Sequence, residues 1–122
     1  MTQTFYIDWK LDGLNEYTTA NRSNPHAGAQ MKKRNEEIVV YAIRQHRIKP
    51  VSKPVRLEYL WIEKDERRDA DNIAFAQKFV QDALVSAGVL PNDNRKWVRG
   101  FSHDFRRGDR TGVQVTITEE AI

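Results

Sequence analysis

Hydrophobic and polar residues alternate in four stretches of the chain, the pattern of half-buried β-strands. The first two stretches cover residues 5–9 and 55–61. The last two cover residues 97–105 and 113–119, and Arg107-Gly108-Asp109 between them is typical of a hairpin connection. The pattern therefore predicts about four strands, of which the last two form a hairpin.

Two further stretches have the spacing of amphipathic helices. Apolar residues recur mainly at three-, four- and seven-residue steps over residues 27–47. A second helix is predicted over residues 72–87, ending at Gly88. Its expected core face consists of Ile73, Ala76, Val80, Ala83 and Ala87. Residues 11–25 predict a loop, because Gly13, three asparagines and Pro25 in this stretch favour turns.

The element order β-α-β-α-β-β predicts an α+β fold with two layers. We expect a single domain over residues 1–122, in which two helices cover one face of a small mixed sheet of about four strands. Trp9, Trp61 and Trp97 lie in predicted strands, which favours core positions over stacking against bases.

Composition narrows the class of protein. With 122 residues, 39% apolar and 30% charged, the chain suits one globular domain. No stretch approaches the roughly 18 apolar residues that span a bilayer. The first residues lack the pattern of a signal peptide, so we expect a cytoplasmic protein without a membrane partner. The absence of cysteine excludes disulfides and thiolate metal sites.

The net charge of +3 is small, but the basic residues are clustered. The clusters are Lys32-Lys33-Arg34, Arg67-Arg68, Arg95-Lys96 and Arg106-Arg107. Such clusters can follow a phosphate backbone, or they can be ordinary solvated surface. Both interpretations remain open at this point.

The segment that most clearly indicates catalytic chemistry is Arg67-Arg68-Asp69-Ala70-Asp71-Asn72. Carboxylates two residues apart point the same way where the backbone is extended, as expected just before a helix. Such a pair can share a hard cation such as Mg²⁺, which activates water for attack on a phosphodiester. The alternative is structural: Asp71 caps the helix and Asp69 favours its positive end.

Lys78 and Asp93 are further candidates, each with a structural alternative. Lys78 follows Asp71 by about two helical turns and could stabilise charge on a reacting phosphate. It could equally form an ion pair with Asp82, four residues later. Asp93 lies in a predicted loop, where functional residues are often displayed, but aspartates there also form Asx-turns.

Several motifs, in order, resemble the RusA family of Holliday-junction resolvases. They are the segment from Arg67 to Asn72, then Lys78, Asp82-Ala83-Leu84, Ala87-Gly88 and Asn92-Asp93, with Leu14-Asn15-Glu16-Tyr17 before and Thr116-Ile117-Thr118-Glu119 after. The resemblance covers nearly the whole chain. The chain departs from the family pattern by three additional residues between Asp71 and Lys78.

The resemblance implies a Mg²⁺-dependent homodimer, often encoded by a phage or prophage, that resolves four-way DNA junctions in recombination and repair. Mn²⁺ is expected to substitute for Mg²⁺. The metal ligands would be Asp69, Asp71 and Asp93, and the catalytic lysine would be Lys78. We expect the DNA contacts to come from Arg67, Arg68, Asn72, Lys32 and Lys33. Two other functions remain open: a non-catalytic DNA-binding protein, and a nuclease that prefers flaps or forks.

The predicted helix raises a geometric problem for these three aspartates. A helix over residues 72–87 is about 24 Å long and carries the chain away from Asp69 and Asp71. The connection from Ala87 to Asp93 spans about 20 Å, and only if it is fully extended. Either the helix is shorter or bent, or the second subunit supplies Asp93. We hypothesise the composite site.

Overall fold

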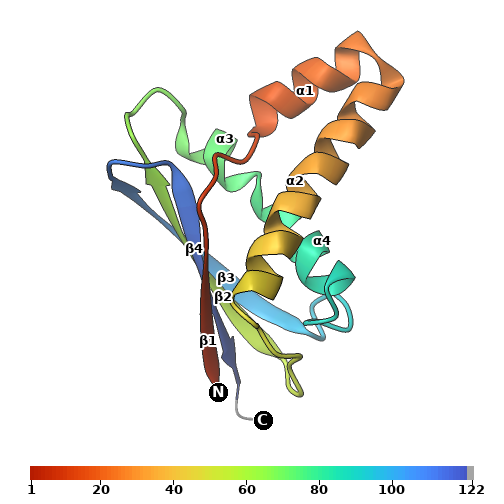
Figure 1. The fold of residues 1–122 in the computed structure, drawn as a ribbon, viewed down its shortest axis with the longest axis vertical. Helices are drawn as coiled ribbons and strands as arrows, with labels where there is room; N and C mark the ends of the chain where they lie inside the picture. The colour runs from red at the N-terminus through yellow and green to blue at the C-terminus, as the bar shows by residue number, and fades with distance from the viewer. Residues whose placement is uncertain (121–122) are drawn as a thin grey trace.

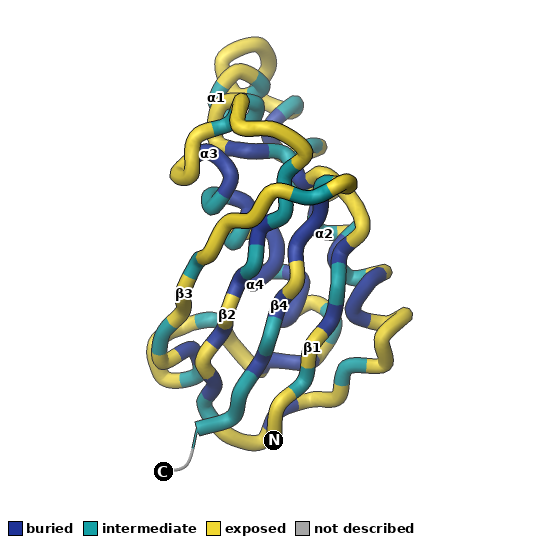
Figure 2. Tube along the Cα trace, turned by 90° about the vertical axis from the view of Figure 1, so that its left-hand side faces the viewer, coloured by how far each residue is buried: buried dark blue, intermediate teal, exposed yellow. Residues whose placement is uncertain are grey.

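The structure is a computed structural model that describes residues 1–120, and it has the predicted α+β architecture. Its strands form one mixed sheet in the order β1-β4-β2-β3, visible from right to left in Figure 2. The strands are β1 (Thr2–Ile7), β2 (Val55–Glu63), β3 (Val98–Arg107) and β4 (Gly112–Glu119). β2 and β3 run parallel, whereas β4 is antiparallel to both β1 and β2.

The helices lie on one side of this sheet (Figure 1). They are α1 (Leu14–Ser23), α2 (Pro25–Gln45), α3 (Ala70–Ala74) and α4 (Gln77–Ser86). α2 packs against α4 and α1, and it also contacts β1. No helix within residues 1–120 has the length and apolar character needed to cross a membrane.

The hydrophobic core lies between the sheet and these helices. Alternate residues of β2 are buried, as their period-two pattern predicts. They meet Val39 and Ile43 of α2 and Val80 and Leu84 of α4 in one cluster. Trp61 is buried in this core, as expected, but Trp9 follows the end of β1 and is 60% exposed. The prediction of a core position for Trp9 is wrong.

The loop predicted over residues 11–25 is also wrong, because α1 occupies most of that stretch. α1 has no buried residue, so the sequence carried no apolar stripe to reveal it. A tertiary contact stabilises its start: the Asn15 N–H donates to Asn72 Oδ1 at 2.8 Å. Gly13 permits this approach, since a Cβ there would lie 2.6 Å from the Asn72 carbonyl oxygen.

The helix predicted over residues 72–87 is divided into α3 and α4. Phe75 and Ala76 form a turn between them. The turn is tightened by i to i+3 bonds, including Lys78 N–H to the Phe75 carbonyl at 3.1 Å. The predicted core face is confirmed apart from the partly buried Ala87, and Gly88 ends α4 with a φ of +78°. Neither glycine nor proline marks the division in the sequence.

The predicted hairpin between the last two strands is wrong. β2 lies between β3 and β4, and both pair with it instead of with each other. The connection after β3 crosses the end of β2, where the Gly108 N–H donates to the Glu63 carbonyl at 2.9 Å. Turn residues show where the chain reverses, but not which strand becomes the neighbour.

Candidate active site

Asp69 and Asp71 lie where the chain leaves β2 and enters α3. Asp69 has extended backbone, with φ −72° and ψ 156°, and it occupies the position before α3 without making a side-chain capping bond. Asp71 accepts one hydrogen bond, from the N–H of Asn72 at 3.0 Å. Both residues are exposed, and neither forms an ion pair within the described part of the chain. Two carboxylates close in sequence are thus left without a cation.

Arg68 anchors the segment that carries these aspartates. Its guanidinium donates to both oxygens of Glu63, at 3.0 and 2.7 Å, and to the Leu11 carbonyl at 3.0 Å. Its side chain is only 12% exposed, whereas that of Arg67 is 89% exposed and is paired with Asp65 at 3.7 Å. Of these two predicted DNA-binding arginines, Arg67 is therefore the accessible one.

Two hollows flank the segment of residues 64–69. One, of about 420 Å³, is lined by basic side chains that include Lys10, Lys64 and Arg110, and also by the acidic Asp8, Glu63 and Asp65. The other, of about 290 Å³, adjoins Ala70 and is lined by Arg68, Arg106 and Arg107 and by the acidic Glu63, Asp65 and Glu66. The Arg106-Arg107 cluster is prominent in the sequence, but only the sheet topology brings it to the same hollow as Ala70, the residue after Asp69. Lys10 and Arg110 carried no comparable sequence signal.

Asn72, predicted to contact DNA, is buried between helices. Its side-chain oxygen binds the Asn15 N–H at the start of α1, as described above. Asn72 therefore ties α1 to α3, which makes it a positioning residue for the segment that holds Asp71.

Lys78 and Lys32 both bind Asp82. Lys78 Nζ lies 3.3 Å from Asp82 Oδ1, and Lys32 Nζ lies 3.3 Å from Asp82 Oδ2. The hydrogen bond and the charge of Asp82 raise the pKa of Lys32 above its usual value. The surface pair considered for Lys78 thus exists, and Lys32 extends it into a bridge between α2 and α4.

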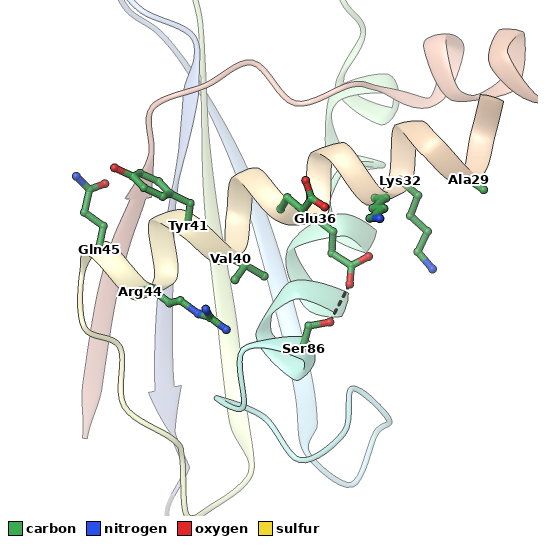
Figure 3. A pocket seen from close by; sticks show the side chains of 10 residues that line it. Ala29, Lys32, Glu36, Val40, Tyr41, Arg44, Gln45 and Ser86 are labelled. Carbon is green, nitrogen blue, oxygen red and sulfur yellow. Dashed lines mark hydrogen bonds between the residues drawn. The ribbon is translucent and has the colours of Figure 1, made fainter. Parts of the chain in front are cut away.

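Lys33 is exposed on α2 and lines, together with Lys32, a groove of about 820 Å³. Figure 3 shows this groove along α2, with Ser86 of α4 donating to Glu36 at 2.9 Å. The groove shares no lining residue with the hollows beside Asp69. The predicted DNA-binding residues are therefore distributed over two separate surfaces.

Asp93 lies at the opposite end of the parallel strand pair. The chain leaves β2 at one end, where Asp69 and Asp71 follow, and it enters β3 at the other end, which Asp93 precedes (Figure 1). A ten-residue strand such as β3 is about 30 Å long. No group of three or more potential metal-ligating residues forms within residues 1–120. The break between α3 and α4 therefore does not bring the three aspartates together in one chain.

The Asx-turns in the loop around Asp93 are formed by its neighbours and not by the Asp93 carboxylate. Asn92 Oδ1 accepts the N–H of Asn94 at 3.0 Å, and Asn94 Oδ1 accepts the N–H of Lys96 at 3.1 Å. Asn92 and Asn94 thus make the side-chain turns, and Asp93 sits between them, partly exposed.

A partly buried polar network that the sequence did not reveal connects β3 to β2 and α4. Trp61 Nε1 donates to His103 Nδ1 at 2.8 Å, and His103 Nε2 lies 2.6 Å from Gln77 Oε1. These partners require a neutral imidazole with its proton on Nε2. Desolvation lowers the pKa of His103 below its usual value, while the nearby Asp104 acts in the opposite direction.

Comparison with known proteins does not identify a family for the chain. No protein-family model matches the chain, and no curated protein matches its sequence significantly.

Proposed function

We propose that the chain is a Mg²⁺-dependent endonuclease that resolves four-way DNA junctions, with Asp69 and Asp71 as its primary metal ligands. The observation that carries the proposal is the pair of exposed carboxylates without a cation partner, near two hollows that are lined by both basic and acidic side chains. Carboxylate oxygens suit a hard cation, and basic side chains suit the phosphates of its substrate. The resemblance to RusA enzymes supports the same assignment.

In this proposal, some residues of the chain would hold the metal ion and others would bind the DNA. A bound Mg²⁺ would polarise the scissile phosphodiester and activate water. Asp69 and Asp71 would hold the ion, and the Arg68–Glu63 pair would keep their segment in place. Arg67, Arg106 and Arg107 would bind phosphates on either side of it. Lys78 would act on the reacting phosphate only after release from Asp82.

Two carboxylates supply only some of the ligands of a Mg²⁺ ion. Water, substrate or a further protein ligand completes such sites. Asp93 of the same chain lies near the far end of β3, so it does not supply that ligand. We retain the hypothesis that a second subunit contributes its Asp93. The homodimer would then have two identical composite sites, as symmetric cutting of a junction requires.

A non-catalytic DNA-binding function is the second candidate. The arginine and lysine side chains among the residues that line the two hollows favour it, because they would bind phosphate with or without a metal. In that case Asp69 and Asp71 would repel DNA slightly and bind no Mn²⁺. A nuclease that prefers flaps or forks would use the same residues as a junction resolvase.

The deciding experiment compares a synthetic four-way junction, a fork, a flap and a linear duplex as substrates, each with and without Mg²⁺. We expect paired cuts in the junction that depend on Mg²⁺. Cutting of the fork or flap alone would leave the metal site intact and reassign the substrate. Binding without any cutting, together with no Mn²⁺ binding in a calorimetric titration, would favour the non-catalytic function.

A further inference from the structure

Trp9 and Tyr41 are the most exposed of the large aromatic side chains. Trp9 follows the end of β1 and is 60% exposed, and Tyr41 of α2 is 67% exposed. Although they lie far apart in the sequence, both line one hollow of about 740 Å³ between β1 and α2, the aromatic hollow. Tyr41 and Gln45, one helical turn apart, lie on the same side of α2 (Figure 3). Packing in the core therefore explains neither ring.

The polar residues that line the aromatic hollow suit the edge of a nucleobase. The Gln45 amide has both donors and an acceptor, and the Glu37 carboxylate accepts hydrogen bonds from exocyclic amino groups. Asp8, a second acidic residue of the hollow, forms an ion pair with Arg110. Because Glu37 would repel a phosphate, the interior of the hollow favours a base over the nucleic-acid backbone.

Basic side chains lie around the aromatic hollow, where the phosphates of a bound strand would be. Lys10 directly follows Trp9 and is exposed. Arg34 lines the hollow, and its side chain is 61% exposed although it lies 3.7 Å from Asp12. Arg44 lines the neighbouring groove along α2. Exposed aromatic faces with basic side chains beside them are the arrangement that binds single-stranded nucleic acid.

We propose that the aromatic hollow binds an unpaired base of a DNA strand, which stacks on Trp9 and Tyr41. Every base has a π-face, so the stacking would tolerate any sequence. A base within a duplex must first leave its stack and its partner, which costs free energy, whereas an unpaired base avoids that cost. The site would therefore select strands that contain unpaired bases.

The aromatic hollow adjoins the hollow of about 420 Å³ described above, because Asp8 lines both. Lys10 and Arg67 line that second hollow, which flanks the segment leading to Asp69. A strand with one base on Trp9 would therefore pass basic side chains on its way to the carboxylates. This step rests on the function proposed above: a base left unpaired at a branch point would hold the neighbouring backbone close to the metal site.

Fluorescence of 2-aminopurine tests the stacking without a metal, because this base analogue loses fluorescence when it stacks on an aromatic ring. The full chain is titrated in EDTA into a short single strand that carries one 2-aminopurine. We expect the wild-type chain to quench the fluorescence of the single strand, but not that of the same strand annealed to its complement. An abasic strand with the same number of phosphates should bind about tenfold more weakly, because stacking is lost.

Substitutions of the two rings identify the residues that stack. Trp9→Ala should lose the quenching and weaken binding of the single strand about tenfold, whereas Trp9→Phe should keep most of both. Tyr41→Ala should also weaken binding, and its exposed position makes a loss of folding unexpected. Phe101→Ala is the matched control, because this ring is 48% exposed on β3 and lies outside the aromatic hollow. Circular dichroism and sedimentation equilibrium verify the fold and the mass of each variant.

A wild-type chain that does not quench the single strand, or that binds the abasic strand equally well, would overturn the proposed base site. A folded Trp9→Ala variant whose mass differs from that of the wild type would also overturn it, and would assign the ring to a protein contact. These outcomes are independent of the metal site. Quenching without Mg²⁺-dependent cutting of a junction would refute the nuclease and keep the base site, and cutting without quenching would do the reverse.

Discussion

Asp82 and the pair Asp69–Asp71 show two different uses of carboxylates in one small protein. Asp82 lies between α2 and α4 with a lysine at 3.3 Å from each of its oxygens. Asp69 and Asp71, at the start of α3, have no cation partner within residues 1–120, although Arg67 and Arg68 directly precede them. Arg68 instead binds Glu63, and Arg67 lies by Asp65.

The difference indicates which acidic residues serve the fold. The charge of Asp82 is compensated inside the molecule, so its role is complete without a ligand. Asp69 and Asp71 are exposed and form no ion pair within residues 1–120, and Asp71 accepts a hydrogen bond only from the Asn72 N–H. Their oxygens are thus available to a divalent cation, which is why we propose the ligand-binding role for Asp69 and Asp71.

The largest expected effect is the loss of cleavage when Asp71 is substituted, compared with the same substitution at Asp82. Asp71→Asn should reduce Mg²⁺-dependent junction cleavage at least about 100-fold, because the metal loses a charged ligand. Binding to the junction and the melting temperature should change little. Asp82→Asn is the matched control: it should keep cleavage and lose roughly 0.3–1 kcal/mol of stability with its partly exposed ion pairs. Equal cleavage by both variants would remove Asp71 from the metal site.

Mixing two inactive variants tests whether Asp93 of one subunit completes the site that holds Asp69 and Asp71 of the other. After subunit exchange between Asp71→Asn and Asp93→Asn, half of the dimers are mixed, and each has one site with every aspartate intact. A composite site should therefore restore about a quarter of the wild-type sites, and these should nick rather than cut symmetrically. Gel analysis of a labelled junction distinguishes nicks from paired cuts. A mixture that stays inactive would mean that each chain builds its own site.

Substitutions of the two arginines before Asp69 should have different effects on stability and on DNA binding. Arg68→Ala leaves Glu63 without its partner in a mostly buried position, which should cost about 2–3 kcal/mol in urea unfolding. Arg67→Ala should change stability by less than about 0.5 kcal/mol. It should instead lower the slope of log K against log[salt] for DNA binding by about one unit. A reversed pattern would make Arg68 the DNA contact.

The smallest effect concerns pH and the His103 network. The folded pKa of His103 lies below the unfolded value of about 6.5, so the unfolded chain takes up a proton first as the pH falls. The contribution to stability is therefore complete above pH 6.5 and declines as the pH drops toward the folded pKa. Urea unfolding between pH 7.5 and 5 measures the decline. His103→Asn should flatten it, whereas the exposed control His26→Asn should leave it unchanged.

The sequence by itself determined the secondary structure wherever a buried face imposed a period. The four strands, the long α2 and the core positions of α3 and α4 could be predicted because apolar side chains must face the core at fixed steps. Gly88 could be predicted because the left-handed end of α4 favours glycine. The common direction expected for Asp69 and Asp71 required extended backbone between them, but α3 begins at Ala70, so only Asp69 is extended.

Only the tertiary structure decided the features that depend on partners far along the chain. α1 buries no residue and is capped by Asn72, fifty-seven positions after Asn15, so no local pattern could reveal it. The insertion of β2 between β3 and β4 removed the hairpin and left β3 at an open edge. The parallel pairing of β2 with β3 placed Asp93 at the opposite end from Asp69 and Asp71. Local periodicity encodes which face of an element is buried, whereas strand order depends on the packing of the whole chain.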